Sequence, residues 1–394
     1  MKDKQFWKGA LAGALATGCV VSAGMAGFWY AGKDSVLDRS STGKVAYLEQ
    51  MIDTYYLGEK DEEKLKEGLY TGLLYGLDDP YSRYYTAEEY ESESSSSQGS
   101  YVGIGILMEK NKEGGVKIAE CYEGGPGEAA GLEEGDVISA IDGEDITQME
   151  IADVADMIRN SEQDHTVLTI HREDVDEAMQ ITVDITDVEL PSVFHEMLDQ
   201  KIGYIRITEF KGVTCEQYRD AFAQLQEQGM ERLIVDLRDN PGGLLDSVCE
   251  ILREILPEGL IVYTEDKDGN RTEESCDGEH ELQMPLAVLV NENSASASEI
   301  FAGAVQDYGI GTIVGMTTYG KGVVQSIRQL SDGSAVKLTI ANYYTPKGNN
   351  IHEIGIKPDM EISMDANLLN KDRDEITHEE DNQLQEAIKA VNID

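Results

Sequence analysis

Positive charge, cysteine and histidine are all scarce in this sequence. The 394 residues include 32 Lys and Arg against 76 Asp and Glu, which gives a formal net charge of −44 at pH 7. A chain this acidic repels polyanions over long distances, so we expect no nucleic-acid partner. The 5 cysteines form no CxxC pair and no Cys/His cluster with the spacing of a zinc site, so we expect no metal site.

Charge is also missing from residues 9–32, directly after three lysines. A helix of this length covers about 36 Å, enough to cross a bilayer, and the lysines favour a cytoplasmic N-terminus. We predict that residues 1–33 form a short cytoplasmic tail and a single-pass signal-anchor in the cell membrane, with the rest of the chain extracytoplasmic. A cleaved signal peptide is the alternative. An extracytoplasmic location permits disulfides, and the sequence leaves open whether the four later cysteines form disulfides or remain free thiols.

Hydrophobic patterns divide the remaining chain into four segments, which predicts a multidomain α/β protein. Residues 34–97 have helical spacing and end at a serine-rich boundary, "ESESSSSQGS". Residues 98–187 alternate short β patterns with turns, which predicts a small, mostly β domain. In residues 188–366 strands alternate with helices, which predicts an α/β domain around a buried sheet. Residues 367–394 form an acidic tail with one amphipathic helix.

The stretch "NSASASE" lies between a strand-like run, "PLAVLV", and a helical run, "IFAGAVQDYG". Ser296 and Glu299 have the spacing of a capping box, which would explain the serine by helix capping alone. The same position suits a nucleophile, because the amides and the positive dipole end of a helix stabilise an oxyanion. A serine hydroxyl is a weak nucleophile, however, and it needs a base.

A lysine is the candidate base, because the 6 histidines are scattered and no GxSxG motif surrounds any serine. Lys321 lies in "VGMTTYGKGVVQ", where Gly315-x-x-x-x-Gly320-Lys321 resembles a phosphate-binding loop. Gly322 replaces the required Ser or Thr and a strand-like run follows, so the nucleotide interpretation fails. A buried Lys321 could act as a general base, since burial lowers the pKa of an amine. A solvated surface lysine is the alternative.

A third stretch, "VDLRDNPGG" at 235–243, ends a strand-like run with a proline and two glycines. Glycine amides can approach a carbonyl oxygen closely, which suits oxyanion binding. A tight turn before the next helix explains the stretch equally well.

The three stretches "DLRDNPGG", "NENSASASEI" and "GKGVVQ", in this order, resemble the carboxyl-terminal processing peptidases, serine endopeptidases with a Ser-Lys dyad. "YVGIGI" and "GLEEGDVISAIDGEDI" resemble a PDZ domain, and "YYTPKGNNIHEIGIKPD" resembles the segment that closes the family's peptidase core. The resemblance runs from about Ala46 to Asp394. It implies a helical cap at 34–97, a PDZ domain at 98–187 and a peptidase core of the ClpP/crotonase type at 188–366.

The resemblance also implies roles for single residues. Ser296 would be the nucleophile, Lys321 the general base, and Gln325 would orient the lysine amine. No metal or organic cofactor is expected. The amides of two residues would form the oxyanion hole and two acidic side chains would support the site, namely Gly242 and Ala297, and Glu299 and Asp307.

The PDZ-like segment suggests how a substrate is selected. Successive amides can hold a free C-terminal carboxylate while an extended peptide adds to a strand. Arg172 lies where some relatives couple the PDZ domain to the peptidase, and an ordinary exposed arginine is the alternative. In relatives the helical cap can mediate dimerisation, so a homodimer is a further expectation. The residues expected to hold the carboxylate are Val102, Gly103, Ile104, Gly105 and Ile106.

Together these patterns predict a membrane-anchored, extracytoplasmic serine endopeptidase that recognises the C-terminal tails of protein substrates and cuts within them. A PDZ binding protein whose peptidase-like domain is catalytically idle is the alternative from another class. A histidine-based PDZ protease is a third hypothesis. The dyad hypothesis requires Ser296 and Lys321 to lie at one site, with the lysine amine buried.

Overall fold

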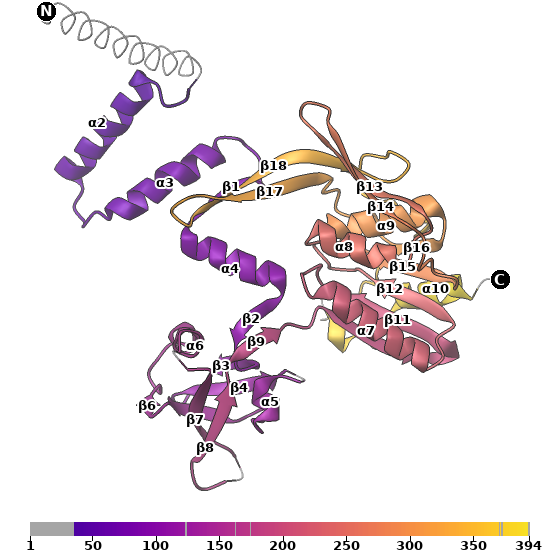
Figure 1. Cartoon of the computed structure of the whole chain (residues 1–394), viewed down its shortest axis with the longest axis horizontal. Coiled ribbons are helices and arrows are strands. Elements are labelled where there is room, and N and C mark those ends of the chain that lie inside the picture. Colours follow the sequence, from indigo (N-terminus) through magenta and orange to yellow (C-terminus); the bar gives the residue numbers. More distant parts are fainter. Residues whose placement is uncertain are drawn as a thin grey trace, which may run out of the picture. The chain divides into compact units, whose positions relative to one another are not determined.

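The computed structural model describes residues 35–392, apart from residues 123, 162, 174, 370 and 372. Two compact units divide at Gly72, and Figure 1 labels most of the elements of both. The predicted membrane anchor lies outside the described residues. Within residues 35–392, no helix combines the length and the apolar character that a membrane span needs.

The first unit contains helix α2 (Arg39–Tyr55) and most of helix α3 (Glu62–Tyr75), as the helical spacing predicted. Asp38 caps α2, because its carboxylate accepts hydrogen bonds from the N–H groups of Ser40 and Ser41. Neither helix has a residue that is buried within the described chain, and many of their apolar side chains are exposed.

After α3 the second unit continues with strand β1 (Arg83–Tyr85) and helix α4 (Ala87–Gln98). The serine-rich run that we interpreted as a boundary forms most of α4. The helix begins where Thr86 and Glu89 bond to each other's backbone N–H groups. It ends at Gly99, whose φ of 77° is left-handed. These two caps explain why so polar a sequence is helical.

The next segment is the predicted small, mostly β domain. Its main sheet has the order β3-β4-β5-β7-β8, with β6 beside β5, and β2 pairs separately with β9. One core, which includes Ile118, Ile138 and Leu168, fills its interior. The elements are β2 (Ser100–Gly103), β3 (Ile106–Lys110), β4 (Val116–Cys121), α5 (Pro126–Ala129), β5 (Val137–Ile141), β6 (Glu144–Asp145), α6 (Ile151–Arg159), β7 (His165–His171), β8 (Met179–Asp184) and β9 (Thr186–Glu189).

The predicted α/β domain is built on a six-stranded sheet of order β10-β11-β12-β15-β16-β19. β10 is antiparallel to β11, and the other neighbouring strands are parallel. The apolar runs of β12 and β15 are buried, as expected for central strands of a parallel sheet. The strands are β10 (Val193–Leu198), β11 (Ile202–Ile207), β12 (Arg232–Asp236), β15 (Leu286–Val290), β16 (Gly311–Gly315) and β19 (Met360–Glu361), and a 3₁₀ turn, η1 (Asp199–Lys201), joins β10 to β11.

Helices cover both faces of this sheet. Alternate residues of β12 face opposite sides: Val235 packs with α7 (Thr214–Glu227), α8 (Leu245–Arg253) and α9 (Ala297–Tyr308). Ile234 packs instead with Leu384 of α10 (Asn382–Val391). The acidic tail therefore supplies a helix to the hydrophobic core.

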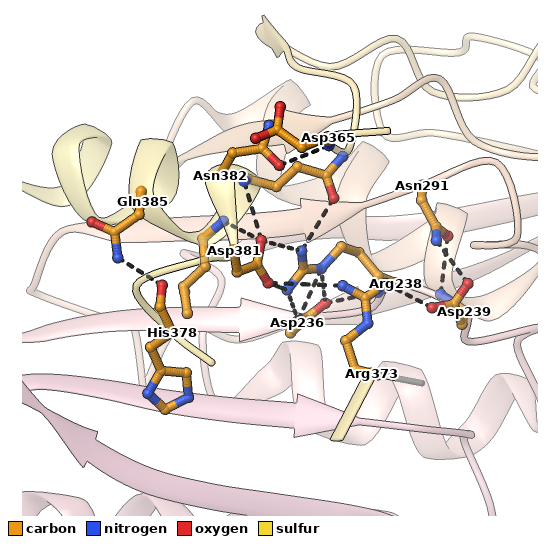
Figure 2. Close-up of polar contacts among 12 residues, drawn as sticks. Asp236, Arg238, Asp239, Asn291, Asp365, Arg373, His378, Asp381, Asn382 and Gln385 are labelled. Atoms are coloured by element: carbon orange, nitrogen blue, oxygen red, sulfur yellow. Dashed lines mark hydrogen bonds and ion pairs between the residues drawn. The ribbon is translucent and has the colours of Figure 1, made fainter. Parts of the chain in front are cut away.

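Buried charges join α10 to the end of β12 (Figure 2). Arg238 is 2% exposed and pairs with Asp236 at 2.5 Å and with Asp381 at 2.8 Å. Arg373, in the short helix η2 (Arg373–Glu375), pairs with Asp239 at 2.7 Å. Burial of the Asp236, Arg238 and Asp381 charges is tolerated because each is paired and hydrogen-bonded.

A second sheet completes the domain. β18 (Ala335–Tyr344) pairs with β17 (Val323–Gln329) along one edge and with β1 and β13 (Gly259–Asp266) along the other. β14 (Arg271–Cys276) pairs with β13. Within the described chain, the outer edge of β17 has no partner strand.

The cysteines of the described chain are unpaired. Burial raises the pKa of Cys215 and of Cys249 to about 12, so both stay protonated at neutral pH and neither suits nucleophilic catalysis. The free thiols are Cys121, Cys215, Cys249 and Cys276.

Candidate active site

Three loops meet at the carboxyl edge of the six-stranded sheet. They follow β12, β15 and β16 and carry the three stretches singled out in the sequence. Parallel strands end at the same edge, so the sheet brings these distant stretches together. They line one cleft of about 320 Å³, which includes Gly242, Ser296, Ala297, Lys321 and Gln325.

Ser296 lies directly before helix α9 and has an unusual backbone, with φ 54° and ψ −113°. Such a conformation is strained for a residue with a side chain, and strain of this kind clusters at functional sites. The N–H of Ala297, in the first helical turn, has no hydrogen-bond partner within the described residues. A serine hydroxyl and an unpaired helix-end amide therefore line the same cleft.

Glu299 connects the serine loop to the lysine loop. Its side chain is fully buried, and Oε2 accepts hydrogen bonds from the N–H groups of Ser296 and Lys321, both at 2.8 Å. Oε1 accepts from Thr318 Oγ1 at 2.6 Å and from Gly320 N–H at 2.7 Å. Burial raises the pKa of Glu299, and these hydrogen bonds oppose the rise. One carboxylate thus holds the backbones of both candidate catalytic residues.

The environment of Lys321 favours the neutral amine. Burial is the main cause that lowers its pKa, and the positive charge of Lys337 lowers it further, while Glu299 and Glu93 oppose the shift. Nζ lies 4.9 Å from the centre of the Tyr81 ring. Within the described residues, Nζ makes no hydrogen bond to the Ser296 hydroxyl.

Gln325 lines the cleft, but its amide points to its own strand pair. Nε2 donates to the carbonyl oxygen of Val323 at 3.3 Å and to Thr339 Oγ1 at 3.4 Å. No hydrogen bond joins Gln325 to the Lys321 amine in the described chain. The orienting role implied by the resemblance would therefore need a different side-chain conformation.

The two glycines of the loop after β12 differ in a way that the sequence could not reveal. The N–H of Gly242 donates to Asn240 Oδ1 at 2.8 Å. The N–H of Gly243, which also lines the cleft, has no partner within the described residues. Neither position accepts a larger residue, because φ is 107° at Gly242 and 139° at Gly243. Of the two glycines, Gly243 rather than Gly242 has an N–H without a hydrogen-bond partner in the described chain.

Apolar side chains and one ion pair form much of the remaining cleft wall. Glu93 of α4 pairs with Lys337 of β18 at 3.1 Å. The Tyr343 hydroxyl donates to the carbonyl oxygen of Lys321, and sequence reasoning missed this residue within the "YYTPKG" stretch. The apolar residues that line the cleft are Phe210, Leu244, Leu245, Ile300, Val323, Val324 and Ile327.

Asp307 does not line this cleft. It lies near the C-terminal end of α9, where its carboxylate accepts hydrogen bonds from Lys347 N–H at 2.8 Å and Asn349 Nδ2 at 3.4 Å. It holds the loop after β18, so it supports the domain at a distance from the serine.

The predicted carboxylate-binding residues join β2 to β3. Val102 and Gly103 pair with β9, whereas Ile104 and Ile106 reach into the core of the small domain. Burial and the nearby Tyr122 raise the pKa of Tyr101 to about 12, while hydrogen bonds from the amides of Ile106 and Gly105 oppose the rise. The carboxylate-binding role of residues 102–106 therefore stays a prediction.

Arg172 follows β7 and bonds within its own domain. Two of its nitrogens donate to the buried Asp136, both at 2.8 Å, and a third donates to Glu133 at 2.6 Å. The Gly131 carbonyl accepts at 2.8 Å. In the described chain its hydrogen bonds all go to residues 131–136, so the coupling role stays a prediction.

Comparison with known proteins agrees with the motifs. The family model described as "Peptidase family S41" matches residues 201–362, and the "PDZ domain" model matches residues 117–172. The chain is 37% identical over 302 residues to the "Carboxyl-terminal-processing protease" of Synechocystis sp., covering 75% of this chain and 71% of that protein.

Two further similarities follow. The chain is 34% identical over 328 residues to the "Probable CtpA-like serine protease" of Staphylococcus aureus (strain COL), covering 82% of this chain and 65% of the longer relative. A solved structure, "Photosystem II D1 C-terminal processing protease", is 29% identical with a TM-score of 0.47, covering 85% of this chain and 91% of that chain. From the family model and the extent of identity, the chain belongs to the carboxyl-terminal processing proteases of peptidase family S41, a family of serine endopeptidases, as its motifs predicted.

Proposed function

We propose that this chain is a membrane-anchored, extracytoplasmic serine endopeptidase that recognises the C-terminal tails of proteins through its PDZ domain and cuts them with a Ser296–Lys321 dyad. One observation carries the proposal. The two side chains line one cleft while the buried Glu299 carboxylate bonds to both of their backbone N–H groups. The uncharged residues 9–32, after three lysines, support the anchor.

In the proposed reaction, neutral Lys321 accepts the proton of the Ser296 hydroxyl as Oγ attacks the carbonyl carbon of the scissile peptide. The N–H groups of Ala297 and Gly243, which have no hydrogen-bond partner within the described residues, stabilise the resulting oxyanion. The Lys321 ammonium then protonates the leaving amine, the C–N bond breaks and an acyl-serine ester remains. Water hydrolyses the ester by the same steps, which releases the new C-terminus and restores Ser296.

The shape and lining of the cleft suit an extended peptide. The outer edge of β17 is unpaired within the described chain, and Val323, Val324 and Ile327 of this strand line the cleft. A substrate strand can pair with such an edge through its backbone, which makes binding tolerant of side-chain sequence. Apolar neighbours such as Phe210 and Leu245 favour apolar substrate side chains near the serine.

A homodimer through the helical cap belongs to the same proposal. α2 and α3 bury no residue within the described chain, and Leu48, Met51 and Leu69 are 50%, 42% and 53% exposed. A second copy would cover these apolar side chains. Sedimentation velocity of the full-length chain in detergent should show a dimer, and Leu48→Glu should shift it to monomer. A wild-type chain that sediments as a monomer would end this part of the proposal.

The central test measures cleavage of an unfolded protein substrate by the full-length chain in detergent. We expect Ser296→Ala and Lys321→Ala to lose activity by at least about 10³-fold, because the nucleophile or its base is gone. The matched controls are Ser331→Ala, in the exposed turn after β17, and Lys347→Ala, which is also exposed. Both should retain wild-type turnover.

Other outcomes would favour the alternatives. Full activity of Ser296→Ala and Lys321→Ala would rule out the dyad. Wild-type chain that binds tails but cuts none of them would favour a catalytically idle PDZ scaffold. If Lys321→Ala remained active while one histidine variant was dead, a histidine-based protease would replace the present proposal.

A further inference from the structure

The turn before β1 packs against the candidate active site. Asp79 shapes this turn, because its Oδ1 accepts the Tyr81 N–H at 3.0 Å and its Oδ2 accepts the Ser82 hydroxyl at 2.6 Å. Ser82 Oγ in turn accepts the N–H of Thr339 at 3.0 Å. Since Thr339 lies on β18, the turn is fixed to the sheet whose neighbouring strand β17 carries Gln325 and directly follows the loop of Lys321.

Tyr81, in this turn, contacts the candidate general base. Lys321 Nζ lies 4.9 Å from the centre of the Tyr81 ring, within the range of about 6 Å over which a ring face attracts an ammonium group. Tyr81 also lines a second cavity together with Tyr319, Gly320 and His352. The ring therefore covers Lys321 from a part of the chain that precedes the PDZ domain.

The same turn is also linked to Gln325, the residue that is expected to orient the Lys321 amine. Thr339 accepts a hydrogen bond from Gln325 Nε2 at 3.4 Å through its side chain, while its N–H holds Ser82. Displacement of the turn would therefore act on Lys321 through Tyr81 and on Gln325 through Thr339. Both contacts join residues far apart in the sequence, so no local pattern in residues 78–82 could predict them.

We propose that Tyr81 is a positioning residue for Lys321, and that its ring keeps the amine away from water and receives it as an ammonium group after it has taken the Ser296 proton. This inference rests on the proposed Ser-Lys dyad. In the first half of the reaction the proton moves from Ser296 Oγ to Lys321 Nζ, and the charge that forms lies beside the ring face. In the second half the same proton passes to the leaving amine, and the ring again covers a neutral amine.

The other charged groups around Lys321 come from three elements. Glu299 faces it from α9, Glu93 from α4, and Lys337 from β18. The two carboxylates favour the ammonium form and Lys337 opposes it, while burial has the largest effect and favours the neutral form. Asp79 and His352 line the second cavity together with Tyr81. The Tyr81 ring is one of the groups that bury the Lys321 amine.

Three variants of the full-length chain in detergent separate these effects: Tyr81→Phe, Tyr81→Leu and Tyr81→Ala. We would measure kcat and KM for an unfolded protein substrate between about pH 5 and pH 10, where the acid limb reports loss of the neutral amine. Tyr81→Phe keeps the ring and should stay within about twofold of wild type in kcat, with the same acid limb.

The other two variants should move the acid limb in opposite directions. Tyr81→Leu keeps the amine dry without a ring face, so the ammonium is less favoured and the limb should move to lower pH. Tyr81→Ala admits water, so the limb should move to higher pH and kcat near neutrality should fall at least about tenfold, with KM within about twofold. A ring that only stabilised the fold would change kcat through the fraction of folded enzyme and leave the acid limb in place.

Two results would overturn the inference. One is a Tyr81→Ala enzyme with wild-type kcat and acid limb, and the other is a Tyr81→Phe enzyme as impaired as Tyr81→Ala, which would assign the effect to the hydroxyl. Should Tyr81→Ala not fold, as judged by thermal unfolding, identical acid limbs for Tyr81→Phe and Tyr81→Leu would overturn it equally. Lys321→Ala, assayed in parallel, shows separately whether the dyad itself is correct.

Discussion

Replacement of Glu299 by glutamine tests whether one carboxylate aligns the nucleophile and the base. Glutamine has nearly the same shape, but it offers one acceptor oxygen and one NH₂ group in place of two acceptor oxygens. Four donors now point at the carboxylate, two at each oxygen. Whichever way the amide turns, its NH₂ group meets two donors.

The structure indicates which orientation costs least. The Thr318 hydroxyl, which already accepts the Ile356 N–H, can rotate and accept from the amide with its second lone pair, so the NH₂ group should turn toward Thr318 and Gly320. The Gly320 N–H and the Thr318 O–H then lose the carboxylate oxygen as their acceptor. A buried donor without a partner costs about 1–3 kcal/mol, and the remaining bonds weaken because the acceptor is no longer charged. Burial raises the pKa of Glu299, so the neutral amide recovers part of the desolvation cost. We therefore expect a loss of about 2 kcal/mol.

Two assays measure this loss. The free energy of unfolding in urea should fall by about 2 kcal/mol, and if the same loss appears in the transition state, kcat falls about thirtyfold. Glu292→Gln is the matched control, since Glu292 is exposed in the same loop and should change stability by no more than about 0.5 kcal/mol. If Glu299→Gln equalled this control in both assays, the carboxylate would not align the two residues.

Three further predictions concern the loop after β12. Asp381→Asn leaves the charge of buried Arg238 partly unpaired and should lower the free energy of unfolding in urea by about 3 kcal/mol; a loss below about 1 kcal/mol would mean that α10 is not held by this pair. Burial raises the pKa of Asp239, but hydrogen bonds from asparagine and arginine side chains outweigh it and lower the pKa to about 2. The ionised Asp239 carboxylate thus stabilises the fold above pH 3.8, and this contribution is lost as the pH falls toward 2. Since the side chain is half-exposed, we expect the contribution to be about 1 kcal/mol. In Asp239→Asn, the free energy of unfolding in urea should no longer fall by this amount between about pH 4 and pH 2, and an unchanged pH profile would contradict the prediction. Gly243→Ala places a Cβ 2.1 Å from the Phe210 carbonyl oxygen at a φ of 139°, so kcat should fall at least about 100-fold; unchanged kcat would show that this amide takes no part in catalysis.

The meeting of the three motif stretches was predictable because each follows a buried strand. An apolar run such as β15, ended by Asn and Ser, marks the point where a central strand leaves the sheet. Parallel strands then place all such points at one edge, so Ser296 and Lys321 reach one cleft although helix α9 and strand β16 lie between them. Hydrophobic periodicity and turn chemistry are enough for this inference, because both are local properties of the sequence.

Other features depend on contacts that no local pattern encodes. Gly242 and Gly243 are identical in sequence terms, and only the direction of the Asn240 side chain decides which amide is free. The strand β1 has only three residues, and it forms because it pairs with β18, which is far away in the sequence. The acidic C-terminal tail looked like an appendage, yet Asp381 pairs with Arg238 across 143 residues of sequence. Long-range charge pairing of this kind has no periodicity from which to predict it.

The contacts of Glu299 also limit how the site can change between rest and catalysis. Because one oxygen bonds to the N–H groups of Ser296 and Lys321, the backbones of the two residues cannot separate without breaking a buried, charge-assisted hydrogen bond. Rotation of the Lys321 side chain remains free of this restraint, and its amine now lies near the Tyr81 ring rather than bonded to the serine hydroxyl. Activation should therefore proceed by rotation of the Lys321 side chain within a fixed backbone frame, which brings the amine within reach of Ser296 while the Tyr81 ring still covers it, and substrate binding need only favour that rotation.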